Sequence, residues 1–318
     1  MAQGINYWSK LPFQQLLKKI EEQKVIPFVG PEVCQPWLPL GKDIASKWAS
    51  EYNYPLRDSY QLSRVAQFLT IQYDDSVTKD KLKNELETIK PPNFAIDSLR
   101  NEPLSLLADL NLPIYITTNY DHFLEESLRS KGKDPISDFC RWSEELSEYA
   151  NDNKINSNLY GKNKELKITQ ANPLVYHLLG DMDHPQSMVL TEKDFIDFVI
   201  FLNKENETKV LPLEIRKKIN SEHLLFIGYS LFDITFSVIF QTVINSGKAN
   251  RSSVGISVQL MSSNGEGDMQ VDNDTVRDYL EQYTRKMFNL YVFPGSAKKF
   301  SEELRLQLDK VASLSPKP

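Results

Sequence analysis

Short apolar runs alternate along this chain with segments in which apolar residues recur every three or four positions. The first pattern is typical of strands and the second of amphipathic helices, so the alternation predicts an α/β fold. Strands are predicted at residues 24–29, 114–118, 174–179, 188–190, 224–228, 252–260 and 290–293. Helices are predicted at residues 13–20, 43–52, 63–73, 80–89, 275–288 and 297–308, and directly after residues 121 and 233.

Residues 58–110 have helical spacing and no strand signal, and Pro91-Pro92 interrupts the pattern within them. We therefore expect a helical insertion between the first two strands, packed over the ligand cleft. Thr191 and Asp194 have the spacing of a capping box, which predicts that a helix begins there.

Two further segments are predicted to be loops. Residues 149–172 are rich in Asn, Lys and Gly, which predicts a long loop or a hairpin. Residues 262–274 contain Gly, Ser, Asn and Asp but no core residues, so a flexible loop is expected there.

Length and charge narrow the class of protein. A chain of 318 residues exceeds the usual domain size, so one large α/β domain over residues 1–318 is expected. A net charge of −6 argues against a surface that neutralises duplex DNA, and no nucleic-acid partner is expected. No apolar run approaches the ~20 residues of a membrane helix, and the N-terminus lacks a signal-peptide pattern. A cytoplasmic protein without a membrane partner is therefore expected.

Polar residues stand where four of the predicted strands end. Gly30 follows the first strand, Asn119-Tyr120-Asp121 the second, Gly180-Asp181 the third and Gly228-Tyr229-Ser230 the next, with Asp233 shortly after. Ligands of open α/β sheets bind at the carboxyl ends of the strands. The alternative interpretation is that these residues only cap the helices that follow, which Asn, Asp and Ser do in any protein.

Two motifs are specific in combination: Thr117-Thr-Asn-Tyr-Asp121 and Gly228-Tyr-Ser-Leu-Phe-Asp233. With the other strand ends they make the chain resemble the SIR2-like family, NAD-binding domains related to sirtuins and frequent in bacterial anti-phage defence. The resemblance implies a Rossmann-like, mostly parallel sheet with helices on both faces and a helical insertion after the first strand. It also implies an assembly, either a homo-oligomer or a multi-component defence system.

The resemblance further implies that NAD lies across the strand ends as substrate or ligand. The residues expected to contact it are Gly30, Pro31, Glu32, Thr118, Asn119, Asp121, Gly180, Gly228, Tyr229, Ser230 and Asp233. Asn119, Asp121 and His177 are the catalytic candidates. Sirtuin deacylases carry a four-cysteine zinc module, whereas this chain has only Cys34 and Cys140, which points away from deacylation.

The implied reaction is hydrolysis of NAD to nicotinamide and ADP-ribose. The leaving nitrogen is already cationic, so nicotinamide departs neutral and no general acid is needed, unlike in glycosidases with paired carboxylates. Asn119 has the chemistry to hold the ribose or orient a water without adding charge. Asp121 could accept a hydrogen bond from a ribose hydroxyl or stabilise the developing positive charge.

The sequence departs from the family pattern at two strand ends. The first loop reads Gly30-Pro-Glu-Val33 instead of Gly-Ala-Gly, so Pro31 offers no N–H and Glu32 places a carboxylate near the phosphates. Where the family has Leu-His-Gly, this chain has Leu178-Leu179-Gly180. His177 precedes Leu179 by two residues, so on a continuous strand its ring would face the same side, ~6–7 Å further back.

Two hypotheses therefore remain open. The first is an NAD hydrolase that serves as an anti-phage effector. The second is a catalytically degenerate module that binds NAD, ADP-ribose or a protein partner without turnover. An ordinary dehydrogenase fits poorly, because there is no Gly-x-Gly-x-x-Gly fingerprint followed by an acidic residue at the end of the second strand. His184 lies in a turn and is expected to be exposed, and no metal site is proposed, because His122 and His223 lack ligand spacing with other His or Cys.

Overall fold

The computed structural model describes residues 7–155, 168–203, 211–229, 234–241, 255–259 and 273–314. Its centre is a 7-stranded sheet with the order β3-β4-β2-β1-β5-β6-β7, in which every neighbouring pair is parallel. The strands are β1 (Val25–Val29), β2 (Ile114–Thr117), β3 (Ile136–Phe139), β4 (Leu174–His177), β5 (His223–Tyr229), β6 (Gly255–Gln259) and β7 (Leu290–Pro294).

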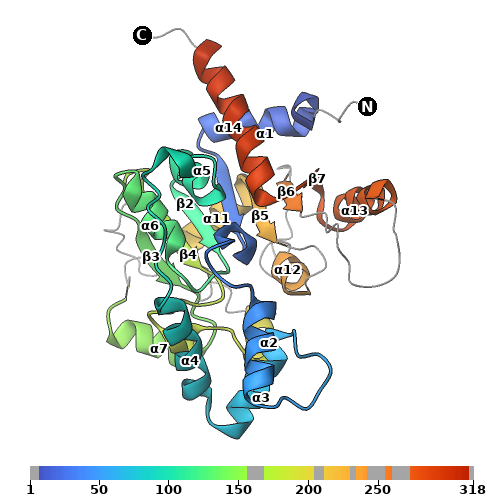
Figure 1. Ribbon diagram of the computed structural model, residues 1–318. Helices are drawn as coiled ribbons and strands as arrows, with labels where there is room; N and C mark the ends of the chain where they lie inside the picture. Colours follow the sequence, from blue (N-terminus) through green and yellow to red (C-terminus); the bar gives the residue numbers. More distant parts are fainter. Residues whose placement is uncertain are drawn as a thin grey trace.

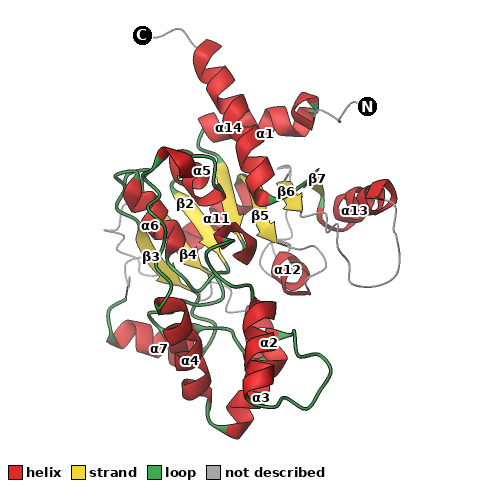
Figure 2. Ribbon diagram, viewed as in Figure 1, coloured by secondary structure: helices red, strands yellow, loops and turns green. Residues whose placement is uncertain are grey.

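Helices connect the strands and surround the sheet (Figures 1 and 2). They are α1 (Leu11–Glu21), α2 (Gly41–Glu51), α3 (Leu62–Gln72), α4 (Asp75–Glu87), α5 (Pro103–Asp109), α6 (Phe123–Ser130), α7 (Glu144–Asp152), α9 (Glu192–Asn203), α11 (Leu213–Ser221), α12 (Ile234–Ile239), α13 (Asn273–Phe288) and α14 (Ala297–Leu314). Short 3-10 turns are η1 (Tyr7–Ser9), η2 (Pro31–Cys34), η3 (Asp97–Leu99) and η4 (Pro185–Ser187). Within the described residues, no helix is both long and apolar enough to cross a lipid bilayer.

Alternate residues of the strands supply two hydrophobic cores, one on each face of the sheet. Val25 and Val29 of β1 pack with α1, α5, α6 and α14, whereas Ile26 and Phe28 pack with α9, α11 and α12. Successive strand side chains point to opposite faces, so a sheet buried on both sides needs apolar residues at nearly every position. The predicted Rossmann-like sheet with helices on both faces is thereby confirmed.

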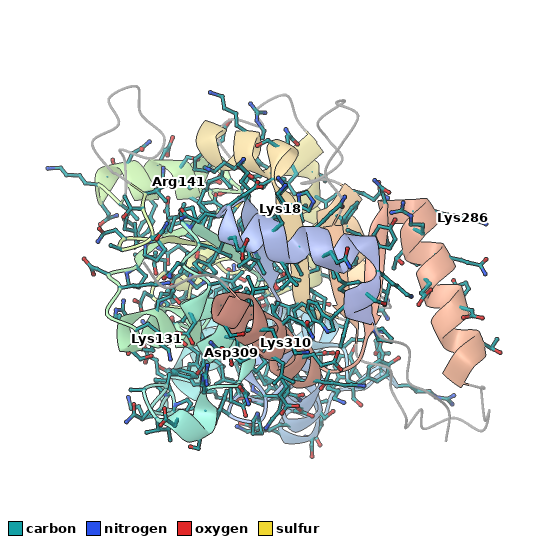
Figure 3. All side chains as sticks on the ribbon, turned by 90° about the horizontal axis from the view of Figure 1, so that it is seen from above. Lys18, Lys131, Arg141, Lys286, Asp309 and Lys310 are labelled. Carbon is teal, nitrogen blue, oxygen red and sulfur yellow. The ribbon has the colours of Figure 1, made fainter. Side chains whose placement is uncertain are left out.

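The second face also carries α13, and η1 and α14 pack together on the first. Trp8 of η1 stacks on Phe300 of α14 with ring centroids 5.8 Å apart, and its indole N–H donates to Glu303 at 2.8 Å. Figure 3 views the molecule from above, with Lys18 on α1 and Lys310 on α14 toward the viewer. In Figure 1 α1 lies at the upper end of the sheet, whereas α14 begins beside β6 and η2 and extends upward from there.

The strand register brings the carboxyl ends of neighbouring strands level with one another. Val29 of β1 is paired with Thr117 of β2 and with Ile227 of β5, and His177 of β4 is paired with both Thr117 and Phe139. Because β2 and β5 flank β1 on opposite sides, the chain changes direction across the sheet at β1. Such a switch point is where ligands enter α/β folds.

A helical layer (α2, α3 and α4) lies beyond these strand ends, as Figure 1 shows. The buried Lys79 of α4 links this layer to the start of α9, because its Nζ lies 3.2 Å from Oδ1 of Asp194. The described structure of residues 58–110 is helical, as predicted, so the helical insertion is confirmed. Its last helix, α5, packs instead on α6 over one face of the sheet.

Several predicted boundaries need correction. Residues 188–190 are not a strand: they are a buried extended segment, in which the Val189 N–H donates to the Leu179 carbonyl at 2.8 Å. Residues 149–152 belong to α7 rather than to a loop, and residues 156–167 lie outside the described residues. Of the predicted flexible loop at 262–274, residues 262–272 lie outside the described residues and the last two begin α13.

The capping box predicted at the start of α9 is confirmed. The Asp194 N–H donates to Thr191 Oγ1 at 3.0 Å, and the Thr191 N–H donates to Asp194 Oδ2 at 3.0 Å. This reciprocal pair satisfies two amide groups that a helix start otherwise leaves without a partner.

Candidate active site

The turn after β2 is shaped by the side chain that ends the strand. Thr117 Oγ1 donates to the Val29 carbonyl of β1 at 3.1 Å and accepts from the Asn119 N–H at 3.0 Å. The chain is thus held against β1 and bent sharply after Thr118. This bend places Asn119 over the loop that follows β1.

Asn119 is buried and most of its polar groups are engaged. Its side-chain Nδ2 donates to the Gly30 carbonyl at 3.4 Å and to Cys34 Sγ at 3.3 Å. Its Oδ1 atom is also buried, yet no hydrogen-bond partner for it is found among the described residues. A buried amide oxygen without a partner is costly in a folded protein. The arrangement leaves Oδ1 available for a ligand hydroxyl or a water.

Asp121 lies on the same side of this turn. Its Oδ1 accepts from the Phe123 N–H at 3.0 Å, which caps the start of α6, and the Cys34 thiol lies 3.7 Å from the same oxygen. Burial raises the pKa of Asp121, and the Phe123 N–H partly offsets this. Burial and the nearby Asp121 also raise the pKa of Cys34, so this cysteine is a neutral thiol that helps to fix both side chains.

His177 lies directly behind the turn, at the end of β4. Its Nδ1 donates to the Asn119 carbonyl at 2.8 Å, and its Nε2 lies 2.7 Å from Oε1 of Glu125. The same Glu125 oxygen accepts from the Ser137 hydroxyl of β3 at 2.6 Å. These contacts join the turn after β2, the strands β3 and β4, and the first turn of α6.

A second imidazole occupies the N-cap position of α6. His122 Nε2 lies 2.9 Å from Oδ1 of Asp181, and its ring meets that of His177 edge-on at 5.5 Å. Burial opposes a charge on His122, but the hydrogen bond to Asp181 raises its pKa. Asp181 has a pKa of about 2 because its charged partners outweigh its burial.

Ligating atoms of His122, His177 and Asp181 lie within 4.8 Å of one another, a cluster that sequence spacing did not reveal. A metal needs a ring nitrogen with a free lone pair. His177 has none, because one nitrogen donates to a carbonyl and the other pairs with Glu125. The donor set therefore suits a hydrogen-bonded network better than a metal ion.

The loop after β1 touches the end of β5 at two glycines. A Cβ on Gly30 would lie 2.4 Å from the Gly228 carbonyl oxygen, and Gly228 has a φ of +83°. The Gly30 N–H donates to the Ile227 carbonyl at 2.8 Å, and Pro31 has no N–H. The loop thus offers fewer amide donors to a pyrophosphate than a glycine-rich loop would.

The other residues expected to contact the ligand follow several different strands. Thr118 Oγ1 donates to the Tyr229 hydroxyl at 3.2 Å, which joins the second and fifth strand ends. Glu32 is half-buried in η2, and this burial raises its pKa although Lys42 opposes the shift. Gly180 has a φ of +99° and packs on the backbone of Ser187. Ser230 and Asp233 lie outside the described residues.

Comparison with known proteins decides the family. The sequence model of the SIR2-like domain matches residues 113–287, from the start of β2 to the end of α13 and over more than half of the chain. The chain belongs to the SIR2-like family. The match begins after β1 and so does not include the loop of Gly30, Pro31 and Glu32.

Two curated relatives of this SIR2-like chain share its sequence in part. One is the NAD(+) hydrolase ThsA of Cytobacillus dafuensis, 25% identical over 161 residues, which are 51% of this chain and 27% of the relative. The other is the NAD(+) hydrolase ThsA of Enterococcus faecium, 25% identical over 150 residues, which are 46% of this chain and 26% of the relative. The aligned stretch thus spans about a quarter of each relative.

The end of β4 differs from the geometry that the sequence predicted. β4 ends at His177, and residues 178 and 179 form a turn, so the two-residue rule for strands does not apply. Leu179 packs into the apolar core on the α9 face, whereas His177 faces Glu125 of α6. The expectation that both side chains share one side was therefore wrong.

Sequence reasoning missed three residues that complete the site. Glu125 occurs in the first turn of a helix, where an acid is favourable in any protein, so nothing marked it as a partner of His177. Ser137 lies on a strand that was not predicted. Cys34 was noted only for zinc, and its contacts with Asn119 and Asp121 depend on how two distant loops meet.

Proposed function

We propose that this SIR2-like chain is an NAD hydrolase module that releases nicotinamide and ADP-ribose. One observation carries the proposal: Asn119 presents a buried, unpartnered Oδ1 at the carboxyl ends of β1 and β2. The names of the two relatives, both NAD(+) hydrolases, support NAD as the substrate. The ligand would lie across the strand ends beneath the helical layer, with the whole of residues 1–318 forming one domain.

The chemistry requires little proton transfer. Nicotinamide leaves as a neutral group, so the site must orient the ribose, stabilise an oxocarbenium-like transition state and admit a water. Asn119 Oδ1 can accept from that water or from a ribose hydroxyl. Asp121 lies on the same turn and can stabilise positive charge when ionised, although burial raises its pKa.

A catalytically silent module is the second candidate, and two observations favour it. Leu179 stands where the family has its histidine and is buried among apolar side chains. The β1 loop offers few amide donors and carries the half-buried carboxylate of Glu32. Such a module would bind NAD, ADP-ribose or a protein partner without turnover.

Titration calorimetry with NAD and ADP-ribose, with free nicotinamide measured in the same samples, separates these functions. We expect nicotinamide release by the wild-type chain and its loss in Asn119→Ala, with the fold left intact. Ser301→Ala is a suitable control, because it removes a buried hydroxyl of α14 that donates to the Ala297 carbonyl and is not among the expected ligand contacts. Binding without release would establish the silent module, and no binding would leave a scaffold for a protein partner.

We further propose that the module acts in the cytoplasm as an anti-phage effector, within a homo-oligomer or a multi-component system. The family's frequency in bacterial defence supports this role. Phage infection should lower the NAD content of bacterial cells that express the wild-type chain. Infected cells that express Asn119→Ala should keep their NAD content. An equal NAD content in both would contradict the role.

A further inference from the structure

His177 has no ring nitrogen free to act on a substrate. Its side chain is 0% exposed, and both ring nitrogens are engaged, one by the Asn119 carbonyl and the other by Glu125. A carbonyl oxygen can only accept, so Nδ1 carries a proton. A general base must reach the water or hydroxyl that it deprotonates. His177 is therefore not placed to act as the base of the reaction.

Glu125 supplies the charge that keeps this imidazole protonated. Its side chain is also 0% exposed, and Ser137 donates to the same carboxylate oxygen that faces His177. Burial alone would lower the pKa of His177, but the Glu125 charge raises it to about 10. Burial likewise opposes a charge on Glu125, yet His177 lowers the pKa of that carboxyl group. The pair is thus ionised at neutral pH.

The hydrogen bond from His177 is one of several that hold Asn119 in place. The Asn119 N–H donates to Thr117 Oγ1, its carbonyl accepts from His177, and its Nδ2 donates to Gly30 and Cys34. Only Oδ1 is left without a partner among the described residues. Groups held in this way need no reorganisation during a reaction, which is the basis of electrostatic preorganisation.

We infer that Glu125 and His177 are positioning residues, a buried ion pair that fixes the Asn119 peptide and thereby aims its side-chain oxygen at the substrate. The inference rests on the proposed hydrolysis of NAD, in which Asn119 faces the ribose. The pair acts from behind the strand ends. Neither residue touches the substrate.

Other charged groups also face this imidazole. The His122 ring lies edge-on to it, and Asp181 pairs with His122. Asp121 lies on the turn between β2 and α6, and its charge interacts with those of Glu125, His177 and His122. Asp181 stays ionised at neutral pH, because its pKa is about 2. A change in the rate of the wild-type chain between pH 5 and 8 would therefore reflect His122 or Asp121, whose pKa values are both raised, whereas a new titration in a Glu125 variant would reflect His177.

Glu125→Gln is the informative variant, because it keeps the size and the hydrogen-bonding capacity and removes the charge. Without that charge burial dominates, and His177 loses its Nε2 proton at neutral pH. The neutral ring still donates from Nδ1 to the Asn119 carbonyl, but this hydrogen bond is weaker because it is no longer charge-assisted. We expect kcat for nicotinamide release to fall about tenfold with KM unchanged, because Asn119 is held less firmly while the groups that bind the rest of the ligand stay where they are. We also expect part of kcat to return at pH 5.5, where the imidazole regains its proton, while the wild-type rate does not rise there.

Arg305→Gln is the matched control. Arg305 is buried and pairs at 2.7 Å with the partly exposed Asp109, so its replacement also breaks an ion pair, but between α14 and α5. We expect it to lower the melting temperature as Glu125→Gln does and to leave kcat and its pH profile unchanged. Equal losses of kcat in the two variants, or no acid recovery in Glu125→Gln, would overturn the positioning role.

Nitrogen-15 NMR of the histidine rings gives a readout without turnover. Both ring nitrogens of His177 should be protonated in the wild-type chain at pH 8, and only one in Glu125→Gln. If the wild-type chain releases no nicotinamide, the proposed function fails. The inference is then judged by the side-chain amide resonance of Asn119: a shift in Glu125→Gln but not in Arg305→Gln supports it. A neutral His177 in the wild-type chain or an unmoved Asn119 resonance overturns it.

Discussion

A Cβ atom on Gly30 would lie 2.4 Å from the carbonyl oxygen of Gly228, so the loop after β1 and the end of β5 meet backbone to backbone. Both glycines were predicted as places where a ligand approaches the chain. The structure shows that they also serve the close approach of the β1 loop to β5. This contact sets the distance between the two strand ends that flank the switch point of the sheet.

Gly30→Ala should therefore be destabilising. The methyl group meets a main-chain oxygen that cannot rotate away, and overpacking of this kind costs about 1 to 3 kcal/mol. Gly132→Ala is the control: its φ is +75°, but nothing lies within 4 Å of the new Cβ, so only the backbone cost of about 1 kcal/mol applies. Urea unfolding measures both. A Gly30 variant no less stable than the Gly132 variant would contradict the close contact.

The capping box of α9 gives a second stability prediction. Thr191→Ala removes the hydroxyl that accepts from the Asp194 N–H, and loss of such a cap costs about 1 kcal/mol. Thr191→Ser keeps the acceptor and should retain most of the stability. Thermal unfolding of both variants tests this. Similar melting temperatures for the alanine and serine variants would show that the cap contributes little.

Local patterns identified the elements that surround the site. The β-branched run of β2 followed by Asn119 and Asp121 predicted a strand, a turn and a helix, and all three are present. β3 was missed, because Ile136–Phe139 is a short edge strand whose alternation is weak. Residues 188–190 are as apolar as a strand, but they pack as an extended segment with no ladder.

The contacts within the site could not be predicted in the same way. Asn119 meets Cys34, which precedes it by 85 residues, and His177 meets Glu125 across 52 residues. Which side chains meet depends on the sheet register and on where each strand stops. The position of His177 shows this, because a strand that ends earlier than expected sends Leu179 to the opposite face.

The pair of His122 and Asp181 should make stability depend on pH. The folded pKa of Asp181 is about 2, so its contribution is present above the unfolded value of about 3.9 and is lost as the pH falls through 2. The folded pKa of His122 is raised, so its contribution is full below about pH 6.5 and is lost as the pH rises. The pair therefore stabilises most between about pH 4 and 6.

His122→Ala should accordingly lower the unfolding free energy by about 2 kcal/mol near pH 5 and by less at pH 2 and pH 9. His223→Ala is the control, because burial lowers the pKa of His223 and its removal cannot produce a maximum near pH 5. Urea unfolding at each pH measures the difference. A difference for His122→Ala that does not vary with pH would contradict the ionised pair.

Glu32 provides the last prediction. If a pyrophosphate binds at the loop after β1, the half-buried carboxylate of Glu32 repels it. Glu32→Gln should then strengthen ADP-ribose binding about fivefold at pH 7.5, which corresponds to about 1 kcal/mol. Because burial raises the pKa of Glu32, wild-type affinity should rise as the pH falls toward 5, whereas the affinity of the variant should not change through this group.

Titration calorimetry with ADP-ribose at several pH values tests this expectation. Glu21→Gln is the matched control, because it removes one exposed acid on α1, far from the strand ends, and makes the same change in net charge. A gain in affinity for Glu32→Gln alone would place the pyrophosphate beside η2. The same affinity in all three proteins would place the phosphates away from Glu32, and the loop of Gly30, Pro31 and Glu32 would then serve only to pack β1 against β5.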